Sequence, residues 1–297
     1  MAKPFLKWAG GKRQLIGEIE ARLPKDFEKC ERYVEPFIGG GALFFHFQDK
    51  YDFDEIHIAD LNPELILCYQ QLQKRAGRVW FFLSKLIKSY PTTIENRKPR
   101  FYDIRNEWNS KVEKIDQMTL DEKSFRVAQT IFLNKTCFNG LFRVNSKGEF
   151  NVPIGSYVNP SFPTKDDLME VKKSLRGVII HLAPFEQCVN WVNENTFVYF
   201  DPPYRPLSET ANFVSYSKGD FNDYDQRSLA GVFRQLDEAG ARLLLSNSDP
   251  KNTNPNDEFF DNLYSKFTIE RVSANRAINS KGSKRGPINE LLIRNYP

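Results

Sequence analysis

Four consecutive residues, Asp201-Pro202-Pro203-Tyr204, have the most specific chemistry in the chain. They follow TFVYF, an apolar run typical of a buried strand, so we expect them at the carboxyl end of a strand, where open α/β sheets bind ligands. Proline has a fixed φ angle and no N–H group, so the two prolines stiffen the turn and leave it rich in acceptors. The turn therefore predicts a rigid set formed by the Asp201 carboxylate and the Pro202 carbonyl, followed by an aromatic ring.

Such a set of acceptors suits an amino group on a flat ring. An exocyclic amine conjugated with its ring is a poor nucleophile, and acceptors on both N–H bonds favour the form in which its lone pair is available. We assign these two hydrogen bonds to Asp201 and to the Pro202 carbonyl. Tyr204 would stack on a base flipped out of a duplex. This stacking offsets part of the cost of unstacking the base, which is roughly a few kcal/mol. The alternative is a rigid turn that merely ends a strand.

A second candidate site follows an earlier predicted strand, YVEPF. The glycines Gly39, Gly40 and Gly41 in IGGGA would let the backbone approach a ligand closely, again beyond a strand's carboxyl end. This cluster does not match the phosphate-binding pattern G-x-x-x-x-G-K-[ST], so no P-loop is indicated. A tight strand–helix connection explains the glycines equally well.

Asp60 ends the next predicted strand, EIHIAD. In nucleotide-binding α/β folds an acidic side chain at this place accepts hydrogen bonds from both ribose hydroxyls. Its alternative role is to cap the following helix, but Asn62 caps well and Pro63 favours the first helical position. We therefore predict that Asp60 binds a ribose and that Asn62 is the cap.

The elements that position these residues indicate an α/β fold. The segment from Tyr33 to Asp60 has the strand–helix–strand pattern of a βαβ unit, which builds parallel sheets. The alternation resumes at Gly177 with further strands and a long amphipathic helix. We expect one Rossmann-like catalytic domain made of residues 1–62 and 166–297.

Between these parts, residues 63–165 show mainly helical periodicity and then a hairpin-like segment, CFNGLFRVNSKGEFNVPIG. Lys147-Gly148 has the chemistry of a turn between its two strands. The sequence therefore predicts a mostly helical inserted domain that carries an exposed β-hairpin.

Composition narrows the class of protein. The 297 residues, 40% hydrophobic and 27% charged, fit a folded globular chain, and a net charge of +4 is only weak support for nucleic-acid binding. There is no apolar run of membrane-spanning length and no signal-peptide pattern, so we expect a cytoplasmic protein without membrane contact. The four cysteines and three histidines form no metal-binding or disulfide pattern, so we expect buried thiols and no metal. Nothing requires more than a monomer.

Three motifs in a fixed order, FLKWAGGK (residues 5–12), EPFIGGGALF (35–44) and DPPY (201–204), make the chain resemble the Dam-type, alpha-group DNA adenine-N6 methyltransferases. The similarity extends through residues 137–157 and 204–216 and so covers most of the chain. It implies a methyltransferase domain that uses S-adenosylmethionine as donor, with the DNA-recognition region inserted between the Gly-rich and DPPY motifs. It also implies transfer to N6 of a flipped adenine in double-stranded DNA.

The resemblance assigns two sets of residues. Those expected to bind or border S-adenosylmethionine are Trp8, Lys12, Phe37, Gly39, Gly40, Gly41, Asp60 and Asp201. Those expected to contact DNA are Lys7, Phe138, Asn139, Leu141 and Arg143. The basic segment NSKGSKRG, residues 279–286, is expected to contact phosphates.

Within the second set, the roles follow family members that carry the hairpin N-G-L-x-R-x-N and methylate GATC. Arg143 would read a guanine through two hydrogen bonds, worth about 1–3 kcal/mol of discrimination, although an arginine on a hairpin more often contacts phosphate or solvent. Phe138 would wedge into the base stack beside the target adenine, and Lys7 would contact the outer base pair. The residues KRQL (12–15) after the AGG turn, together with the hairpin, make the chain resemble the restriction-modification branch, in which a cognate restriction endonuclease is a functional but not a physical partner.

Several alternatives remain open from the sequence. The DPPY tetrad also serves DNA cytosine-N4 methyltransferases, and only the hairpin argues for adenine. Cytosine-C5 chemistry needs a nucleophilic cysteine, commonly after proline, and none of the four cysteines follows one. A protein-glutamine or RNA methyltransferase would have no use for the hairpin. A catalytically idle DNA-binding regulator on the same fold would be expected to lose Asp201 or Tyr204.

Overall fold

The computed structural model describes residues 2–8, 10, 12–205, 221–275 and 287–297. Within them, contacts define two compact units. The first comprises Met1–Gly11, Gly39–Lys50 and Asn62–Ile180, and the second comprises Lys12–Ile38, Tyr51–Leu61 and His181–Pro297. The predicted insert, residues 63–165, lies inside the first unit, while its role as a separate recognition domain stays a prediction. The predicted phosphate-contacting segment 279–286 and most of residues 204–216 lie outside the described residues.

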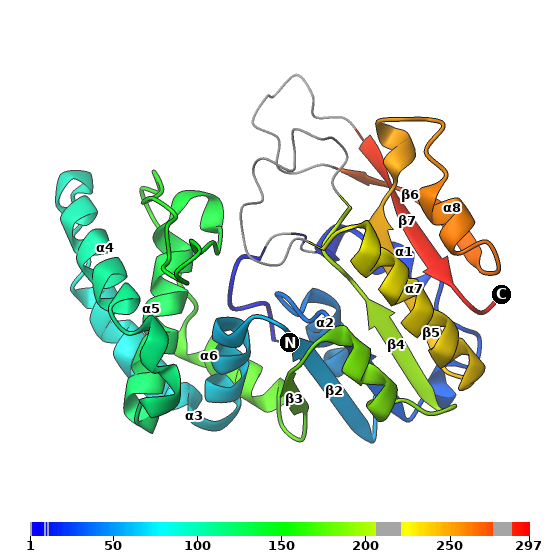
Figure 1. Cartoon of the computed structure of the whole chain (residues 1–297). Helices are drawn as coiled ribbons and strands as arrows, with labels where there is room; N and C mark the ends of the chain where they lie inside the picture. Colours follow the sequence, from blue (N-terminus) through cyan, green and yellow to red (C-terminus); the bar gives the residue numbers. More distant parts are fainter. Residues whose placement is uncertain (1, 9, 11, 206–220, 276–286) are drawn as a thin grey trace. The chain divides into compact units, whose positions relative to one another are not determined.

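Seven strands form one sheet in the order β3-β2-β1-β4-β5-β7-β6 (Figure 1). Their bounds are β1 Arg32–Glu35, β2 Glu55–Asp60, β3 Ile179–Leu182, β4 Thr196–Phe200, β5 Arg242–Ser248, β6 Thr268–Asn275 and β7 Pro287–Arg294. Strand β1 pairs in parallel with β2 and β4, and β4 pairs in parallel with β5, which confirms the predicted α/β class. Strand β7 is antiparallel to both β5 and β6. Alternation of apolar residues gives no strand direction, so the sequence did not predict this antiparallel edge.

Strand β4 is almost entirely apolar because both of its faces are covered. All five residues of β4, TFVYF, are buried, as expected for a parallel strand between two layers. Helix α7, Asp223–Glu238, lies along β4 and β5 in Figure 1 and packs Leu229 and Phe233 into the same core as Val198 and Leu243. Burial of such a cluster is the main stabilising contribution to this unit.

The other helices of the second unit are short. They are α1 Ile16–Glu20 and α8 Phe259–Leu263, with 3₁₀ turns at Lys12–Gln14, Phe27–Lys29, Phe185–Trp191 and Pro250–Asn252. Helix α1 and the first two 3₁₀ turns precede β1, and the others lie in connections between strands. Strand β1 is followed by the glycine-rich segment, β2 ends in Asp60, and β4 is followed by the proline-rich turn.

The first unit is helical, as predicted. Its helices are α2 Ala42–Lys50, α3 Pro63–Lys88, α4 Ile94–Asn109, α5 Leu120–Thr136 and α6 Lys165–Ser174, with 3₁₀ turns at Val112–Gln117 and Phe138–Gly140. Helix α3 is interrupted only by the non-helical backbone of Arg75. As predicted, Asn62 caps α3, because its side chain accepts hydrogen bonds from the N–H groups of Glu64 (3.0 Å) and Leu65 (3.1 Å).

A buried ion pair joins three of these helices. Arg126 of α5 is 2% exposed and bonds Glu64 of α3 through Nε (2.9 Å) and Nη2 (2.6 Å). Its guanidinium also donates to the Trp108 carbonyl of α4 (2.9 Å) and lies 4.0 Å from the Trp108 ring centroid. With every one of these groups paired, the helices are locked in one arrangement, and loss of one partner would leave a buried charge uncompensated.

The four cysteines confirm the predicted burial. All four cysteines are buried thiols, and burial raises the pKa of Cys30 to about 11 and that of Cys188 to about 12. Such thiols are poor nucleophiles near neutral pH. Among the described residues, no helix is long and apolar enough to cross a membrane.

Two histidines of the second unit contact each other. His57 of β2 and His181 of β3 share a hydrogen bond between ring nitrogens of 2.9 Å, and both rings stack with Trp191. His57 also pairs with Glu55, which is bound to Arg32 at 2.8 Å. Burial, and then the nearby His57, lower the pKa of His181.

This lowered pKa predicts a loss of stability on mild acidification. The unfolded chain takes up a proton at His181 near pH 6.5 whereas the folded chain resists it, so stability falls as the pH drops from about 6.5 toward the folded pKa. We expect the free energy of unfolding of His181→Gln, measured in urea between pH 7.5 and 5, to fall less steeply than that of the unchanged protein. His46→Gln, outside this cluster, is the control. Equal slopes in all three proteins would contradict the assignment.

Candidate active site

Asp201 is the first residue after β4 and therefore lies at the carboxyl edge of the sheet. Its Oδ1 atom is 2.8 Å from Lys12 Nζ and accepts a hydrogen bond from the Ser246 hydroxyl at 3.2 Å. Ser246 is held in turn by the Tyr199 hydroxyl, 2.9 Å away. Among the described residues no hydrogen bond reaches Oδ2, so one carboxylate oxygen is fixed by the protein and the other is available to a ligand.

The electrostatics of this carboxylate are a balance between burial and pairing. Asp201 is 20% exposed and Lys12 only 5%. Burial raises the pKa of Asp201 above its ordinary value, with Glu290 adding to the rise, while the Lys12 ammonium and the hydroxyl of Ser246 act against it. Lys12, predicted from the sequence to border the cofactor, is thus the direct counter-ion of Asp201.

Tyr204 lies against the same lysine. Lys12 donates a hydrogen bond to its hydroxyl, and the Lys12 ammonium is 4.1 Å from the centroid of its ring. The Tyr204 hydroxyl donates to Glu290 Oε2 at 2.5 Å. Burial and then the carboxylates of Asp201 and Glu290 raise the pKa of Tyr204, so the phenol stays neutral and remains a donor. The structure therefore brings Lys12, Asp201 and Tyr204 together.

Glu290 is a residue of this cluster that sequence reasoning missed. It lies on β7 opposite Ser248 of β5 in the antiparallel pair. Its only sequence signal is a carboxylate within the apolar strand NELLIRN, a pattern that an exposed strand position explains equally well.

Two other predicted cofactor residues lie in the same unit. Asp60 ends β2, and its backbone carbonyl accepts a hydrogen bond from the Ala183 N–H at 3.3 Å. Phe37, two residues beyond β1, stacks on Phe185 with ring centroids 5.4 Å apart and meets Phe221 edge-on at 5.7 Å. Phe37 is therefore fixed by aromatic packing, and its predicted contact with a cofactor stays a prediction.

The glycine segment and Trp8 meet within the first unit. A Cβ atom on Gly39 would lie 3.0 Å from Trp8 Cδ1, and one on Gly40 would lie 3.1 Å from Trp8 Cβ. Gly41 has φ +69°, and a Cβ there would lie 2.6 Å from the Tyr69 hydroxyl. The glycines are thus required at least for close packing of Trp8 and Tyr69, a reason that the sequence alone did not reveal.

Trp8 also contacts the predicted recognition hairpin. Its ring stacks on Phe142, with centroids 5.4 Å apart and an interplanar angle of 22°. Phe142 directly precedes Arg143, the predicted base reader. The FLKWAGGK motif and the predicted recognition hairpin therefore meet in one aromatic contact within the first unit.

Asn134 of α5 connects the same two segments through hydrogen bonds. Its Oδ1 accepts from the Lys7 N–H (2.8 Å), and its Nδ2 donates to the carbonyls of Lys7 (2.9 Å) and Gly140 (2.8 Å). The Asn134 side chain is fully buried. Lys7 extends to Tyr157, with Nζ 3.2 Å from its hydroxyl. Sequence reasoning did not single out Asn134 or Tyr157, because an Asn in a helix and a Tyr in a loop have no pattern that predicts such partners.

The hairpin confirms its predicted turn. Antiparallel bridges pair Val144 with Phe150 and Cys137 with Ile154, and the Asn145 side chain accepts hydrogen bonds from the N–H groups of Lys147 and Glu149, both at 3.0 Å. The last Asn of N-G-L-x-R-x-N therefore builds the turn.

The predicted DNA-contacting residues lie on the accessible side of this segment. Phe138 is 51% exposed, Arg143 and Asn139 are exposed, and Leu141 is half-buried. Asn139 has φ +54°, a left-handed conformation that Asn tolerates better than most residues. Arg143 is oriented by a hydrogen bond from Nε to Asn151 Oδ1 of 2.7 Å, which leaves the outer face of its guanidinium accessible.

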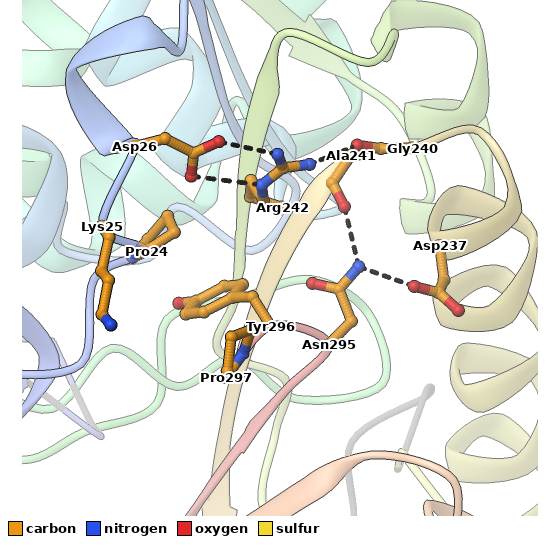
Figure 2. A pocket seen from close by; sticks show the side chains of 10 residues that line it. All are labelled: Pro24, Lys25, Asp26, Asp237, Gly240, Ala241, Arg242, Asn295, Tyr296 and Pro297. Atoms are coloured by element: carbon orange, nitrogen blue, oxygen red, sulfur yellow. Dashed lines mark hydrogen bonds and ion pairs between the residues drawn. The ribbon is translucent and has the colours of Figure 1, made fainter.

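A cavity of about 430 Å³ lies in the second unit, at the end of the sheet opposite to Asp201 (Figure 2). It is bordered by the first residue of β5, Arg242, which pairs with Asp26 at 2.8 Å, and by Asn295, which donates to Asp237 at 2.8 Å. None of the predicted site residues borders it. The candidate active site is therefore the residue cluster around Asp201.

Comparison with known proteins agrees with the motifs and their placement. A family model described as D12 class N6 adenine-specific DNA methyltransferase matches residues 8–278. The chain belongs to this family. It is 46% identical over 298 residues to "Type II methyltransferase M.MjaIII" of Methanocaldococcus jannaschii, covering 99% of each chain. It is 38% identical to "Type II methyltransferase M1.LlaDCHI" of Lactococcus lactis subsp. cremoris, covering 99% of this chain and 95% of the relative.

A third relative is the "DNA adenine methylase" of Vibrio cholerae, 35% identical over 297 residues, with 98% of this chain and 95% of the relative covered. Membership of the D12 class confirms the predicted adenine-specific DNA methyltransferase and its α/β fold. It decides against cytosine-N4 transfer and against an idle regulator. As a methyltransferase of this class, the chain uses double-stranded DNA as substrate, and S-adenosylmethionine is the donor that the family implies.

The hydrogen bonds of Asn134 predict how much its side chain contributes to the free energy of unfolding. Asn134→Ala leaves the Lys7 amide and two carbonyl groups without their partner, so we expect the free energy of unfolding to fall by about 2–3 kcal/mol. Urea-induced unfolding followed by circular dichroism measures this change. Asn159→Ala, at an exposed position of the same unit, is the control with the same substitution and should lose little. A loss in Asn134→Ala no larger than in this control would refute the assigned role.

Proposed function

We propose that the protein methylates N6 of adenine within GATC in double-stranded DNA, by flipping the adenine out of the duplex and transferring the methyl group directly. The observation that carries the proposal is the arrangement of Asp201, with Oδ1 held by Lys12 and Ser246 and with Oδ2 unoccupied by any described residue. A fixed acceptor at the end of a strand is what an exocyclic amine needs to expose its lone pair.

In this mechanism the chain's own residues orient the adenine. Asp201 Oδ2 and the Pro202 carbonyl accept hydrogen bonds from the two N6–H groups, so the nitrogen lone pair turns toward the donor. Bound S-adenosylmethionine supplies an electrophilic methyl group on a positively charged sulfur. When the N–C bond forms and the C–S bond breaks, N6 becomes positively charged, and Asp201 is the base positioned to receive the proton it then loses.

The residues of the second unit fit the proposed donor. Asp60 ends β2 and Asp201 follows β4, both at the carboxyl edge, where an adenosine ribose and a sulfonium group would meet acidic partners. Lys12 limits the negative charge that Asp201 contributes. The predicted cofactor contacts of Trp8, Phe37 and Gly39 to Gly41 remain part of this proposal.

The recognition step is assigned to the hairpin. Arg143 has an accessible guanidinium on an oriented side chain, and the exposed ring of Phe138 can enter a base stack. Lys7, Asn139 and Leu141 complete the proposed DNA-contacting set. The relatives named as type II methyltransferases favour a restriction-modification setting, in which methylation protects DNA from a cognate endonuclease.

The site and its reader are tested together. Transfer from labelled S-adenosylmethionine is measured on matched duplexes containing GATC, a single-base variant of it, or neither, with mass spectrometry of the nucleosides. We expect N6-methyladenine only with GATC, and a loss of discrimination of about 10- to 150-fold in Arg143→Ala. Lys147→Ala, at the exposed hairpin tip, should change transfer to all duplexes equally. Methylation at another sequence, or undiminished discrimination in Arg143→Ala, would reject the assigned site or its reader.

The catalytic role of Asp201 is tested separately. In Asp201→Ala we expect single-turnover methyl transfer to fall by at least about 100-fold, because a transition-state interaction is lost, while DNA affinity changes little. Asp26→Ala, which also breaks an ion pair but at the opposite end of the sheet, is the control and should remain active. A catalytically active Asp201→Ala enzyme would remove the carboxylate from the mechanism.

A further inference from the structure

We propose that Gln226 and Asn247 are positioning residues for methyl transfer, which hold the Pro203 carbonyl and so fix the turn from Asp201 to Tyr204 in its reactive geometry. This inference rests on the catalytic role proposed for that turn. It names two residues that lie outside the turn and its neighbouring charges.

The two amides form a chain of hydrogen bonds that ends on the turn. Gln226 Nε2 donates to the Pro203 carbonyl at 3.2 Å, and Gln226 Oε1 accepts from Asn247 Nδ2 at 3.2 Å. Both side chains are fully buried. Buried amides are stable only when they are hydrogen-bonded, so each one fixes the next in a single orientation.

The turn depends on such outside donors because of its own composition. Pro202 and Pro203 have no N–H group, so neither can donate a hydrogen bond that would fix the turn to the surrounding structure. The carbonyl of Pro203 is therefore held by a side chain. Among the described residues none donates to the Pro202 carbonyl, so that acceptor stays available for the substrate amine.

The end of β5 is built to hold this segment at three points. Its last residues, Ser246-Asn247-Ser248, replace the apolar run of the strand with polar side chains. Ser246 bonds Asp201, Asn247 bonds Gln226, and the Ser248 hydroxyl donates to the Arg205 carbonyl at 3.3 Å. Asp201, Pro203 and Arg205 are thus each held, directly or through Gln226, from consecutive positions of one strand.

The start of α7 also holds this segment. We call the contacts from β5 and α7 to residues 201–205 the clamp. Asn222 caps the helix in a reciprocal capping box with Asp225, which fixes the first turn that carries Gln226. Asp223, in the same turn, pairs with Arg205 at 2.6 Å, and Arg205 pairs also with Asp257 at 2.8 Å. The residues on both sides of Tyr204 are therefore attached to α7.

A clamp on the turn acts on the rate of transfer more than on binding. The hydrogen bonds proposed for Asp201 and Pro202 matter most in the transition state, and displacement of reacting groups by about 1 Å can cost about 100-fold in rate. Gln226 touches neither substrate in this arrangement. Its loss should therefore lower kcat and leave KM for S-adenosylmethionine and affinity for the duplex nearly unchanged.

The test compares Gln226→Met with the same substitution elsewhere. Gln71→Met, at a buried glutamine that bonds Ser124 in the first unit, is the matched control. Single-turnover rates, KM and thermal unfolding are measured for both. We expect the rate to fall about 10- to 100-fold in Gln226→Met only, with KM within about threefold of the original. A change in KM alone, or equal rate losses in both variants, would overturn the proposal.

Two further variants keep the test decisive if Gln226→Met folds poorly. Asn247→Ala leaves Gln226 without its anchor, so we expect a smaller fall in rate, and no additional fall when it is combined with Gln226→Met. Gln226→Glu keeps the size of the side chain and donates to Pro203 only when protonated, so its rate relative to the original enzyme should rise as the pH is lowered. Additive losses with no pH effect would reject the clamp.

Asp201→Ala in the same assay separates this inference from the proposed function. If Asp201→Ala stays active, the mechanism fails whatever Gln226 does. If Asp201→Ala is inactive and Gln226→Met is not impaired, the mechanism stands and only the clamp is refuted.

Discussion

An ionised carboxylate at the end of a strand whose five residues are all buried is unstable unless the surrounding chain compensates for its lost hydration. Asp201 is in this position, and polar residues of the second unit compensate for its lost hydration. Lys12 supplies the opposite charge, Ser246 the hydrogen bond, and Tyr199 holds Ser246. Because these partners occupy one oxygen only, the compensation leaves the carboxylate able to act as an acceptor.

In the first unit, hydrogen-bond partners likewise compensate for the lost hydration of uncharged backbone groups. Its N-terminal segment has no secondary structure of its own at Lys7, so the Asn134 side chain satisfies the backbone of that residue. The same amide holds Gly140, and Trp8 packs on Phe142 beside it. A segment without helix or strand is thereby fixed in position, and it places the FLKWAGGK motif against the hairpin.

Sequence reasoning succeeded where the cause is local. The cap at Asn62, the turn at Lys147-Gly148 and the strand before the DPPY turn each depend on neighbours a few residues away, and the structure has all three. It did not delimit helix α4, because that segment is polar and contains Pro99; the large buried residues described in it are Arg97, Phe101, Ile104 and Trp108. Tertiary contacts there override a weak local signal.

The missed residues of the site share another cause. Glu290 and Asn134 have partners 86 and 127 residues away, and Asn247 and Gln226 are 21 residues apart. A single sequence does not contain these pairings. One feature of the sequence does point to these partners: β5 ends in Ser-Asn-Ser after three leucines. A buried strand that turns polar at its carboxyl end requires a polar partner beyond it.

The wide sequence separation of these partners also determines when the protein can assemble during its synthesis. Lys7 bonds Asn134 across 127 residues, Lys12 bonds Tyr204 across 192, and Arg22 bonds Glu270 across 248. At about 5–20 residues per second, Lys12 waits roughly 10 to 40 s on the ribosome before Tyr204 is made. Glu290 follows later still, so every sequence motif of the catalytic cluster has been synthesised before the cluster can close. During synthesis β1 therefore lacks its neighbour β4 until residues 196 and beyond have been made, and an unpaired strand edge of this kind favours aggregation.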